Sequence, residues 1–356
     1  MSARAFFARL PIPILQAPMV GASTLEMALA VGRAGGLGAL AAGALAPDAI
    51  GPAVQAFRDR SVGPFAVNLF VIPSVKPSGD VVADAIRRLA PWYAELGIEI
   101  PSPPNDFAPD FDAQFAALVR TAPPVASFTF ACLSRDRVAA LQAAGSLVVG
   151  TATTVAEARA WAEVGADAIC AQGAEAGGHR GHFLADTAAS LVGTMALVTT
   201  SRAAVDLPVI AAGGIMDGRG VAAALALGAV AAQMGTAFLL ADETAISPAW
   251  RAALEAARDD PTRLTRAFTG RHARGIENRF MRELRGVEDE VPAYPVQNRL
   301  TQPLRAAAAQ AGEPDMLSLW AGQGVKLIQP GGAEDLVRRW WAQAGDAARE
   351  TAARTG

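Results

Sequence analysis

The chain has 356 residues, of which 52% are apolar and 18% are charged, and its formal net charge is −3. That length accommodates a full hydrophobic core, and the weak charge argues against a basic surface for nucleic acid or an anionic membrane. Small molecules bound by local groups are therefore the expected partners. Two cysteines are too few for a disulfide framework or a zinc cluster.

The sequence gives no indication of secretion or membrane insertion. Its first ten residues lack the apolar run that a secretory signal needs. Residues 208–238 are strongly apolar, but Asp217 and Arg219 interrupt them, so they do not predict a membrane span. A cytoplasmic location is the resulting expectation.

Short apolar segments recur along the chain, each followed by a turn signal and an alanine-rich stretch with helical periodicity. The predicted strands are 12–17, 38–41, 65–70, 125–130, 147–151, 168–172, 209–212 and 231–234. Predicted helices between them include 24–34, 135–144, 155–164 and 220–227. This alternation predicts parallel strands with helical crossovers, and eight such strands close a (β/α)8 TIM barrel.

Cap residues support several of these helix boundaries. Ser134 and Thr154 stand where a side chain would cap a helix start. Glycines follow the predicted helices at the position where a left-handed residue ends a helix, namely Gly35, Gly145, Gly165 and Gly228.

Two regions depart from the alternation. Residues 72–121 contain seven prolines and predict an elaborated loop around one helix over 81–96, inserted where it would overhang an active site. From about residue 242 the strands are expected to stop, with helices over 249–258, 299–310 and 334–348. We therefore expect a barrel domain over 1–241, with the insertion, and a smaller, mainly helical substrate-side domain over 242–356. The last helix is a candidate to pack back on the barrel.

His179 lies in a glycine-rich loop, 173–181, that directly follows the apolar strand 168–172. Barrel enzymes carry their chemistry at this end of the strands. His179 is therefore predicted to be an active-site base, acid or charge stabiliser. The alternative is a loop histidine that only bonds backbone carbonyls.

Glycines also follow the last two predicted strands. Gly213 and Gly214 come after one strand, and Gly235 and Thr236 come after the next. Glycine lets a phosphate approach the backbone, and the loops after strands seven and eight of such barrels commonly bind phosphate. A phosphate site is predicted here, with ordinary turns between strand and helix as the alternative.

Three uncharged side chains lie in or at the ends of apolar strands. Asn68 and Gln172 are amides that either are satisfied internally or bind a ligand such as the edge of a flavin ring. Met19 is either core filler or the border of an aromatic ring. The chain contains no dinucleotide fingerprint, Walker loop, HExxH or GxSxG motif, and no metal site is predicted.

Taken together, several motifs closely resemble the nitronate monooxygenase family, formerly called 2-nitropropane dioxygenases. They are Gln-Ala-Pro-Met at 16–19, Gly-Gly-Leu-Gly at 35–38, the segments 64–70 and 172–181, Ala-Ala-Gly-Gly-Ile at 211–215 and Gln-Met-Gly-Thr at 233–236. The resemblance continues through 266–271 and 319–323. Thr129 stands where many relatives have a second histidine.

The resemblance implies an FMN-dependent enzyme that oxidises alkyl nitronates, such as propionate 3-nitronate, with O2 to a carbonyl compound and nitrite. By position, His179 would be the catalytic residue, and Tyr294 is a substrate-side candidate for which ordinary packing is the alternative. The implied FMN contacts, with Gly213 added from the predicted phosphate site, are Met19, Asn68, Gln172, Gly177, Gly213, Gly214, Gln233, Met234, Gly235 and Thr236.

Two other functions remain open from the sequence. One is an FMN-dependent NAD(P)H reductase of the enoyl-acyl-carrier-protein reductase or quinone reductase type, because such enzymes share the glycine loops and the Gly-Gly-His. The other is a non-catalytic flavin-binding protein. The motifs at 16–19 and 172–179 favour the nitronate family. The physiological substrate, the choice between monomer and homodimer, and the role of His179 as base or charge stabiliser are left open.

Overall fold

The computed structural model describes residues 1–259 and 261–355. Eight parallel strands lie in the order β1-β9-β8-β6-β5-β4-β3-β2, and a bridge between Leu15 and Leu37 joins the two ends into a ring. The strands are β1 (Ile14–Gln16), β2 (Gly38–Ala41), β3 (Phe65–Phe70), β4 (Val125–Thr129), β5 (Leu147–Ala152), β6 (Ala168–Gln172), β8 (Val209–Ala212) and β9 (Ala231–Met234). The predicted TIM barrel is confirmed, and the strands differ from their predicted bounds by at most two residues at an end.

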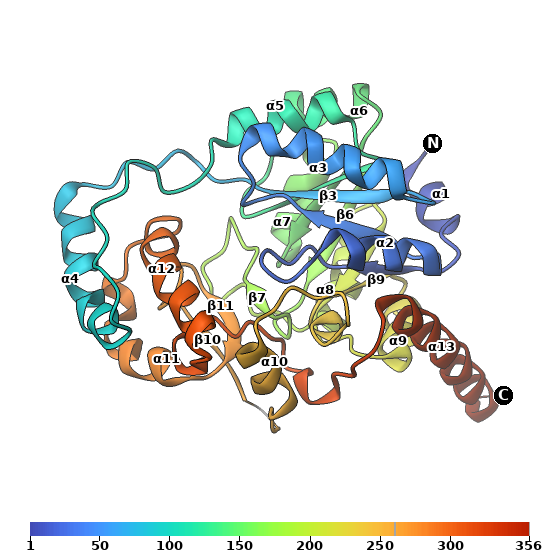
Figure 1. Cartoon of the computed structure of the whole chain (residues 1–356). Helices are drawn as coiled ribbons and strands as arrows, with labels where there is room; N and C mark the ends of the chain where they lie inside the picture. Colours follow the sequence, from blue (N-terminus) through green and yellow to red (C-terminus); the bar gives the residue numbers. More distant parts are fainter. Residues whose placement is uncertain (260, 356) are drawn as a thin grey trace.

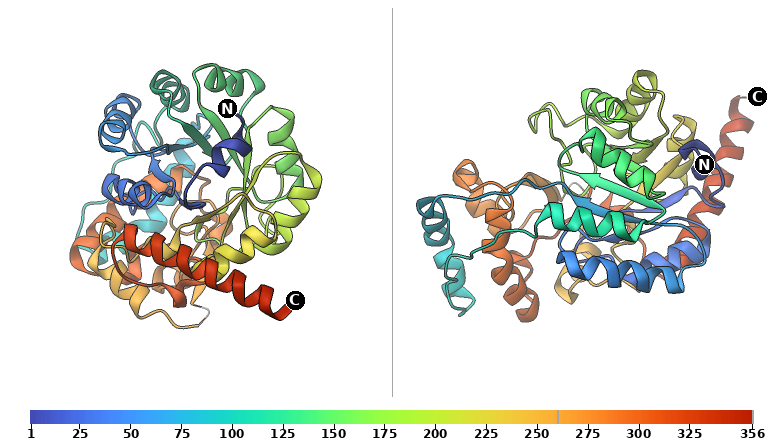
Figure 2. Two further views of the ribbon diagram at one scale, coloured as in Figure 1. Left: turned by 90° about the vertical axis from the view of Figure 1, so that its right-hand side faces the viewer. Right: turned by 90° about the horizontal axis from the view of Figure 1, so that it is seen from above.

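Helices surround this ring (Figure 2). They include α2 (Leu25–Ala34), α3 (Pro47–Arg60), α6 (Arg135–Ala143), α7 (Val155–Glu163), α8 (Thr194–Ala204) and α9 (Gly218–Ala226). Ser134 and Thr154 accept backbone hydrogen bonds as N-caps, as predicted. The four predicted glycines all have a positive φ, between 88° and 99°, which confirms the helix ends.

A short N-terminal helix, α1 (Ala3–Ala8), closes one end of the barrel. Its Phe6 and Phe7 pack against apolar side chains of the barrel strands, among them Val125, Val149 and Ile210. The opposite end of the barrel, where the strands reach their carboxyl termini, is left for a ligand.

The insertion after β3 contains two helices rather than the single one predicted. Helix α5 (Phe111–Thr121) packs beside α3 on the barrel, with Leu118 fully buried. Helix α4 (Gly79–Glu95) lies beside α12 (Val296–Ala311) (Figure 1). The Tyr93 hydroxyl of α4 donates a 2.6 Å hydrogen bond to the carbonyl oxygen of Leu300. The insertion thus braces the region that follows the barrel.

The expectation that strands stop near residue 242 is wrong. Strands β10 (Thr262–Thr265) and β11 (Ala273–Ile276) form a second sheet with β7 (Gly178–His179), in the order β10-β11-β7. The sequences of β10 and β11 lack a strong apolar alternation, so the local sequence does not predict them as strands. They are strands because they pair with each other and, through β11, with the distant β7. The rest of this region contains α10 (Pro248–Glu255), α11 (Arg279–Leu284), α12 and the short 3-10 helices η2 (Arg285–Glu290), η3 (Pro314–Met316) and η4 (Val325–Leu327). Another 3-10 helix, η1 (Thr236–Phe238), directly follows β9. The domain division at 241/242 stays a prediction.

The last helix, α13 (Ala333–Thr355), returns to the barrel and lies against α9 and α2 (Figure 1). Its Trp340 is fully buried and packs edge-on against Phe238 at 5.0 Å between ring centroids. A Cβ on Gly218 would lie 2.1 Å from the carbonyl oxygen of Trp340, so glycine permits this close approach. Within the described residues, no helix has the length and apolar character that spanning a membrane requires.

We expect Trp340→Ala to destabilise the protein by about 3–5 kcal/mol, because it leaves a large cavity between α13 and the barrel. The neighbouring Trp341, which is 37% exposed, provides the matched control. Trp341→Ala should cost about 1 kcal/mol or less. Urea unfolding measures both values, and equal losses for the two variants would contradict the packing of α13.

Candidate functional site

A cavity lies at the carboxyl ends of the barrel strands, opposite α1. The loops after several strands line it, together with β7, α12 and residues 320–324. Of the predicted site residues, those that line it are Met19, Asn68, Gln172, Gly177, His179, Gly213, Gly214, Gln233, Gly235, Thr236 and Tyr294. Met234 is the exception, because its side chain is buried in the core between the barrel and its helices.

The glycines of three loops meet on one wall of this cavity. Gly213 and Gly214 have φ values of 109° and 73°, which other residues adopt only with strain. Over the described residues, no acceptor bonds the backbone N–H of Gly214 or Gly235. The Thr236 hydroxyl accepts a 2.9 Å hydrogen bond from the N–H of Gly322 and keeps its own proton for another acceptor. This wall, the glycine cradle, presents donors suited to an anion such as a phosphate.

The buried amides have two different roles. Gln172 is satisfied internally, since its Nε2 donates to the carbonyl oxygen of His179 at 3.0 Å and its Oε1 accepts from Gly181 N–H at 2.8 Å. It therefore fixes the loop that carries His179. Asn68 donates through Nδ2 to the carbonyl oxygen and the hydroxyl of Ser127, both at 3.1 Å. Its Oδ1 has no donor in the described parts of the chain and remains open to a ligand.

His179 is held by strand pairing and by one side-chain hydrogen bond. It lies opposite Ala273 in the β7–β11 ladder, and its Nε2 is 2.9 Å from the Thr269 hydroxyl. That hydroxyl donates its single proton to the carbonyl oxygen of Arg271 at 3.0 Å, so it accepts from Nε2–H. The arrangement assigns the Nε2–H tautomer and leaves Nδ1 as the lone-pair nitrogen.

Aromatic rings enclose the imidazole. The ring centroids of Phe130, Tyr294 and Trp320 lie 5.5, 5.6 and 5.7 Å from that of His179. Phe130 follows β4 with a φ of 88°, a strained conformation for a non-glycine residue, of the kind that gathers at functional sites. The guanidinium of Arg271 lies 4.4 Å from the centre of the Phe130 ring.

Burial is the main cause of the shifted pKa values of the ionisable side chains around His179. Desolvation, followed by the charges of Arg271 and Arg305, lowers the pKa of His179 to about 3. The imidazole is therefore neutral near neutral pH. Burial likewise raises the pKa of Tyr294 to about 12, which keeps its phenol neutral, and lowers the pKa of Arg305 to about 10, which leaves its guanidinium charged.

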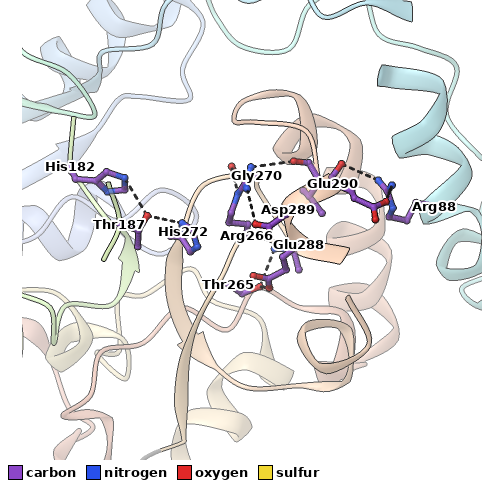
Figure 3. A network of polar contacts seen from close by, with 12 residues as sticks. Arg88, His182, Thr187, Thr265, Arg266, Gly270, His272, Glu288, Asp289 and Glu290 are labelled. Atoms are coloured by element: carbon purple, nitrogen blue, oxygen red, sulfur yellow. Dashed lines mark hydrogen bonds and ion pairs between the residues drawn. The ribbon is translucent and has the colours of Figure 1, made fainter. Parts of the chain in front are cut away.

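A polar network outside the cavity ties the His179 loop to the second sheet. The Thr187 hydroxyl lies 2.8 Å from His272 Nδ1 and 3.4 Å from His182 Nε2, and the three side chains form a row (Figure 3). Arg271 Nε donates to the carbonyl oxygen of Arg180 at 3.0 Å. These contacts join the residues that follow His179 to the segment between β10 and β11.

Sequence reasoning missed Phe130, Thr269, Trp320 and Arg305, all of which line the cavity. Thr269 and Trp320 lie within the motifs at 266–271 and 319–323, so a signal was present without an assigned role. Nothing in the sequence pattern marked Phe130 or Arg305. Both follow from tertiary packing.

Comparison with known proteins identifies the family. The family model described as nitronate monooxygenase matches residues 4–341. The chain belongs to the nitronate monooxygenase family. This result confirms the resemblance drawn from the motifs and makes the protein a flavin-dependent oxidoreductase that acts on small-molecule nitronates.

Individual relatives agree with this assignment. A probable nitronate monooxygenase of Staphylococcus aureus (strain Newman) is 39% identical over 316 residues, which are 88% of this chain and 89% of that protein. One from Staphylococcus saprophyticus is 38% identical over 337 residues, 94% and 95% of the two chains.

Two solved structures have folds similar to that of this nitronate monooxygenase family member. The nitroalkane oxidase from Streptomyces ansochromogenes superposes with a TM-score of 0.90 at 42% identity, covering 98% of this chain and 99% of that one. FabK from Thermotoga maritima superposes with a TM-score of 0.78 at 28% identity, covering 99% of each chain. The nitroalkane oxidase is thus more similar in both fold and sequence than FabK.

In the substrate-free protein, we expect the His179 imidazole to stay neutral from about pH 8 to about pH 5, because its lowered pKa lies well below that range. Nitrogen-15 NMR of the histidine side chains measures this, with His179→Asn providing the assignment. The urea-unfolded chain serves as the control, since its histidines titrate at about pH 6.5. A midpoint near that value in the folded protein would contradict the burial of His179.

Proposed function

We propose that this protein binds FMN in the cavity and uses it to oxidise alkyl nitronates with O2, giving a carbonyl compound and nitrite. The observation that carries the proposal is a single cavity with an anion-binding glycine cradle on one wall and a neutral imidazole of assigned tautomer on another. A cytoplasmic location and a monomeric or homodimeric state stay predictions of the sequence.

The cavity residues fit FMN. The free N–H groups of Gly214 and Gly235 and the Thr236 hydroxyl suit a single phosphate. Asn68 Oδ1 can accept from the polar edge of an isoalloxazine ring. The side-chain amide of Gln233 lines the cavity without a hydrogen bond to any described residue, and it offers both donor and acceptor. Met19 borders the same space. When bound, FMN would supply the electron-transfer chemistry of the reaction.

Of the two roles left open for His179, its neutrality favours that of a base. With Nε2–H engaged by Thr269, Nδ1 is the nitrogen that takes a proton from the α-carbon of a neutral nitroalkane. Negative charge that develops on the nitro group during this step raises the proton affinity of the adjacent imidazole. A permanently charged imidazolium is disfavoured, since burial and then the cations Arg271 and Arg305 lower the pKa of His179.

Flavin analysis and oxygen uptake test the proposed function. The purified protein should release FMN on heating, identified by chromatography. Propionate 3-nitronate or ethylnitronate should drive faster oxygen consumption than NADH. Faster oxidation of NADH, with little response to either nitronate, would instead select a reductase like the structural neighbour FabK.

We expect His179→Asn to slow the turnover of neutral nitroethane by about 10²-fold or more, the scale for loss of a general base. Preformed ethylnitronate needs no α-proton removed, so its turnover should fall much less. Steady-state oxygen consumption with both substrates measures the difference, and unchanged flavin content is the control. Equal losses for both substrates would contradict the base and favour a role in binding the anion.

A further inference from the structure

Arg305 brings a positive charge into the cavity from α12. Within the described residues that line the cavity, it is the only arginine, lysine, aspartate or glutamate. The lining imidazole of His179 is neutral, and so is the phenol of Tyr294. The cavity wall therefore carries one uncompensated positive charge.

The donors of Arg305 are only partly used. Its Nη2 donates to the carbonyl oxygen and the Oδ1 of Asn298, at 3.0 and 2.9 Å. These bonds orient the guanidinium from within its own helix. The buried Nε has no acceptor, and no carboxylate forms an ion pair with Arg305 anywhere in residues 1–259 and 261–355.

An unpaired, largely buried cation is costly, so such a group is expected to meet an anion when the site is filled. The neighbouring cation does not take this role. Arg271 donates to the backbone carbonyl oxygens of Arg180 and His182, stacks on Phe130, and does not line the cavity. Among the described residues, Arg305 alone is both charged and open to the cavity.

We propose that Arg305 is the anion-binding residue of the substrate site and selects substrates that carry a planar, two-oxygen anion. Both the nitronate group itself and a carboxylate elsewhere on the substrate are planar anions with two oxygens. Guanidinium groups bind such anions through charge-assisted hydrogen bonds. The inference rests on the proposed function. It restricts the substrates of that function to molecules that carry a negative charge.

The position of Arg305 assigns it to substrate rather than to the flavin phosphate. Arg305 bonds Asn298 on α12, and this helix begins two residues after Tyr294. Because the Tyr294 ring lies 5.6 Å from the His179 ring, Arg305 belongs to the imidazole wall. The glycine cradle is built from other elements, the loops that follow β8 and β9. An anion held at Arg305 would share the cavity with the Nδ1 that we propose removes the α-proton. The guanidinium would then stabilise the negative charge that develops on the nitro group.

Replacement of Arg305 in the flavin-loaded protein tests this assignment. For Arg305→Met we expect the KM for propionate 3-nitronate to rise about 10- to 100-fold, the range for one lost charge-assisted hydrogen bond. Arg305→Lys keeps the charge and should recover part of the loss. Arg299→Met is the matched control, because Arg299 is exposed on the same helix, and it should leave KM unchanged.

Two comparisons identify the anion. If Arg305 binds the nitronate group, the KM for ethylnitronate, which has no carboxylate, rises as much as that for propionate 3-nitronate. If it binds a substrate carboxylate, only the KM for propionate 3-nitronate rises. Either result supports the proposal, whereas unchanged KM values for both substrates in a folded Arg305→Met protein overturn it.

Direct binding separates this proposal from the proposed function. Nitrate and propionate are unreactive planar anions, and their dissociation constants are measurable by calorimetry on the flavin-loaded protein. At least one should bind Arg305→Met about 10-fold or more weakly than wild type. This result would support Arg305 as an anion site even if neither nitronate were oxidised. Equal affinities for both anions, or loss of flavin from Arg305→Met and Arg305→Lys while both stay folded, would overturn it.

Discussion

The pairing of β7 with β11 is the constraint on which the site depends. Gly178 and His179 lie in the loop that follows the barrel strand β6. They form a ladder with Ala273 and Arg274, nearly a hundred positions further along the chain. This ladder turns a glycine-rich loop into ordered strand and brings Thr269 to the imidazole of His179. Without it, the barrel would keep the glycine cradle but would lose the oriented imidazole that we propose as the base.

The same pairing explains the electrostatics of the cavity. Closing the second sheet over the barrel mouth buries His179 among aromatic rings and places it near two arginines, and both effects favour the neutral imidazole. The cationic charge that disfavours a protonated histidine favours an anion at the same place. In the proposed mechanism, the neutral His179 acts as the base and Arg305 binds the anion, two tasks that one charged histidine would otherwise combine.

The barrel and the region after it contribute different parts of the site. The barrel loops supply backbone donors through glycines such as Gly214 and Gly235, whose positions follow from where the strands end. The later region supplies side chains, namely Thr269, Tyr294, Arg305 and Trp320, and the insertion braces it through the hydrogen bond between Tyr93 and Leu300. In the proposed function, cofactor binding thus rests on the more regular half of the chain, and substrate choice rests on the more irregular half.

The barrel, the positions of the cradle glycines and the placement of His179 at the carboxyl ends of the strands could all be predicted from the sequence. These features are local, since apolar runs, cap residues and glycines lie next to the elements they define. Tertiary structure alone decided that Gln172 is satisfied internally, that Met234 lies in the core, and that Arg305 faces the cavity. It also decided the protonation of His179, because burial and the approach of charges depend on segments far apart in the chain.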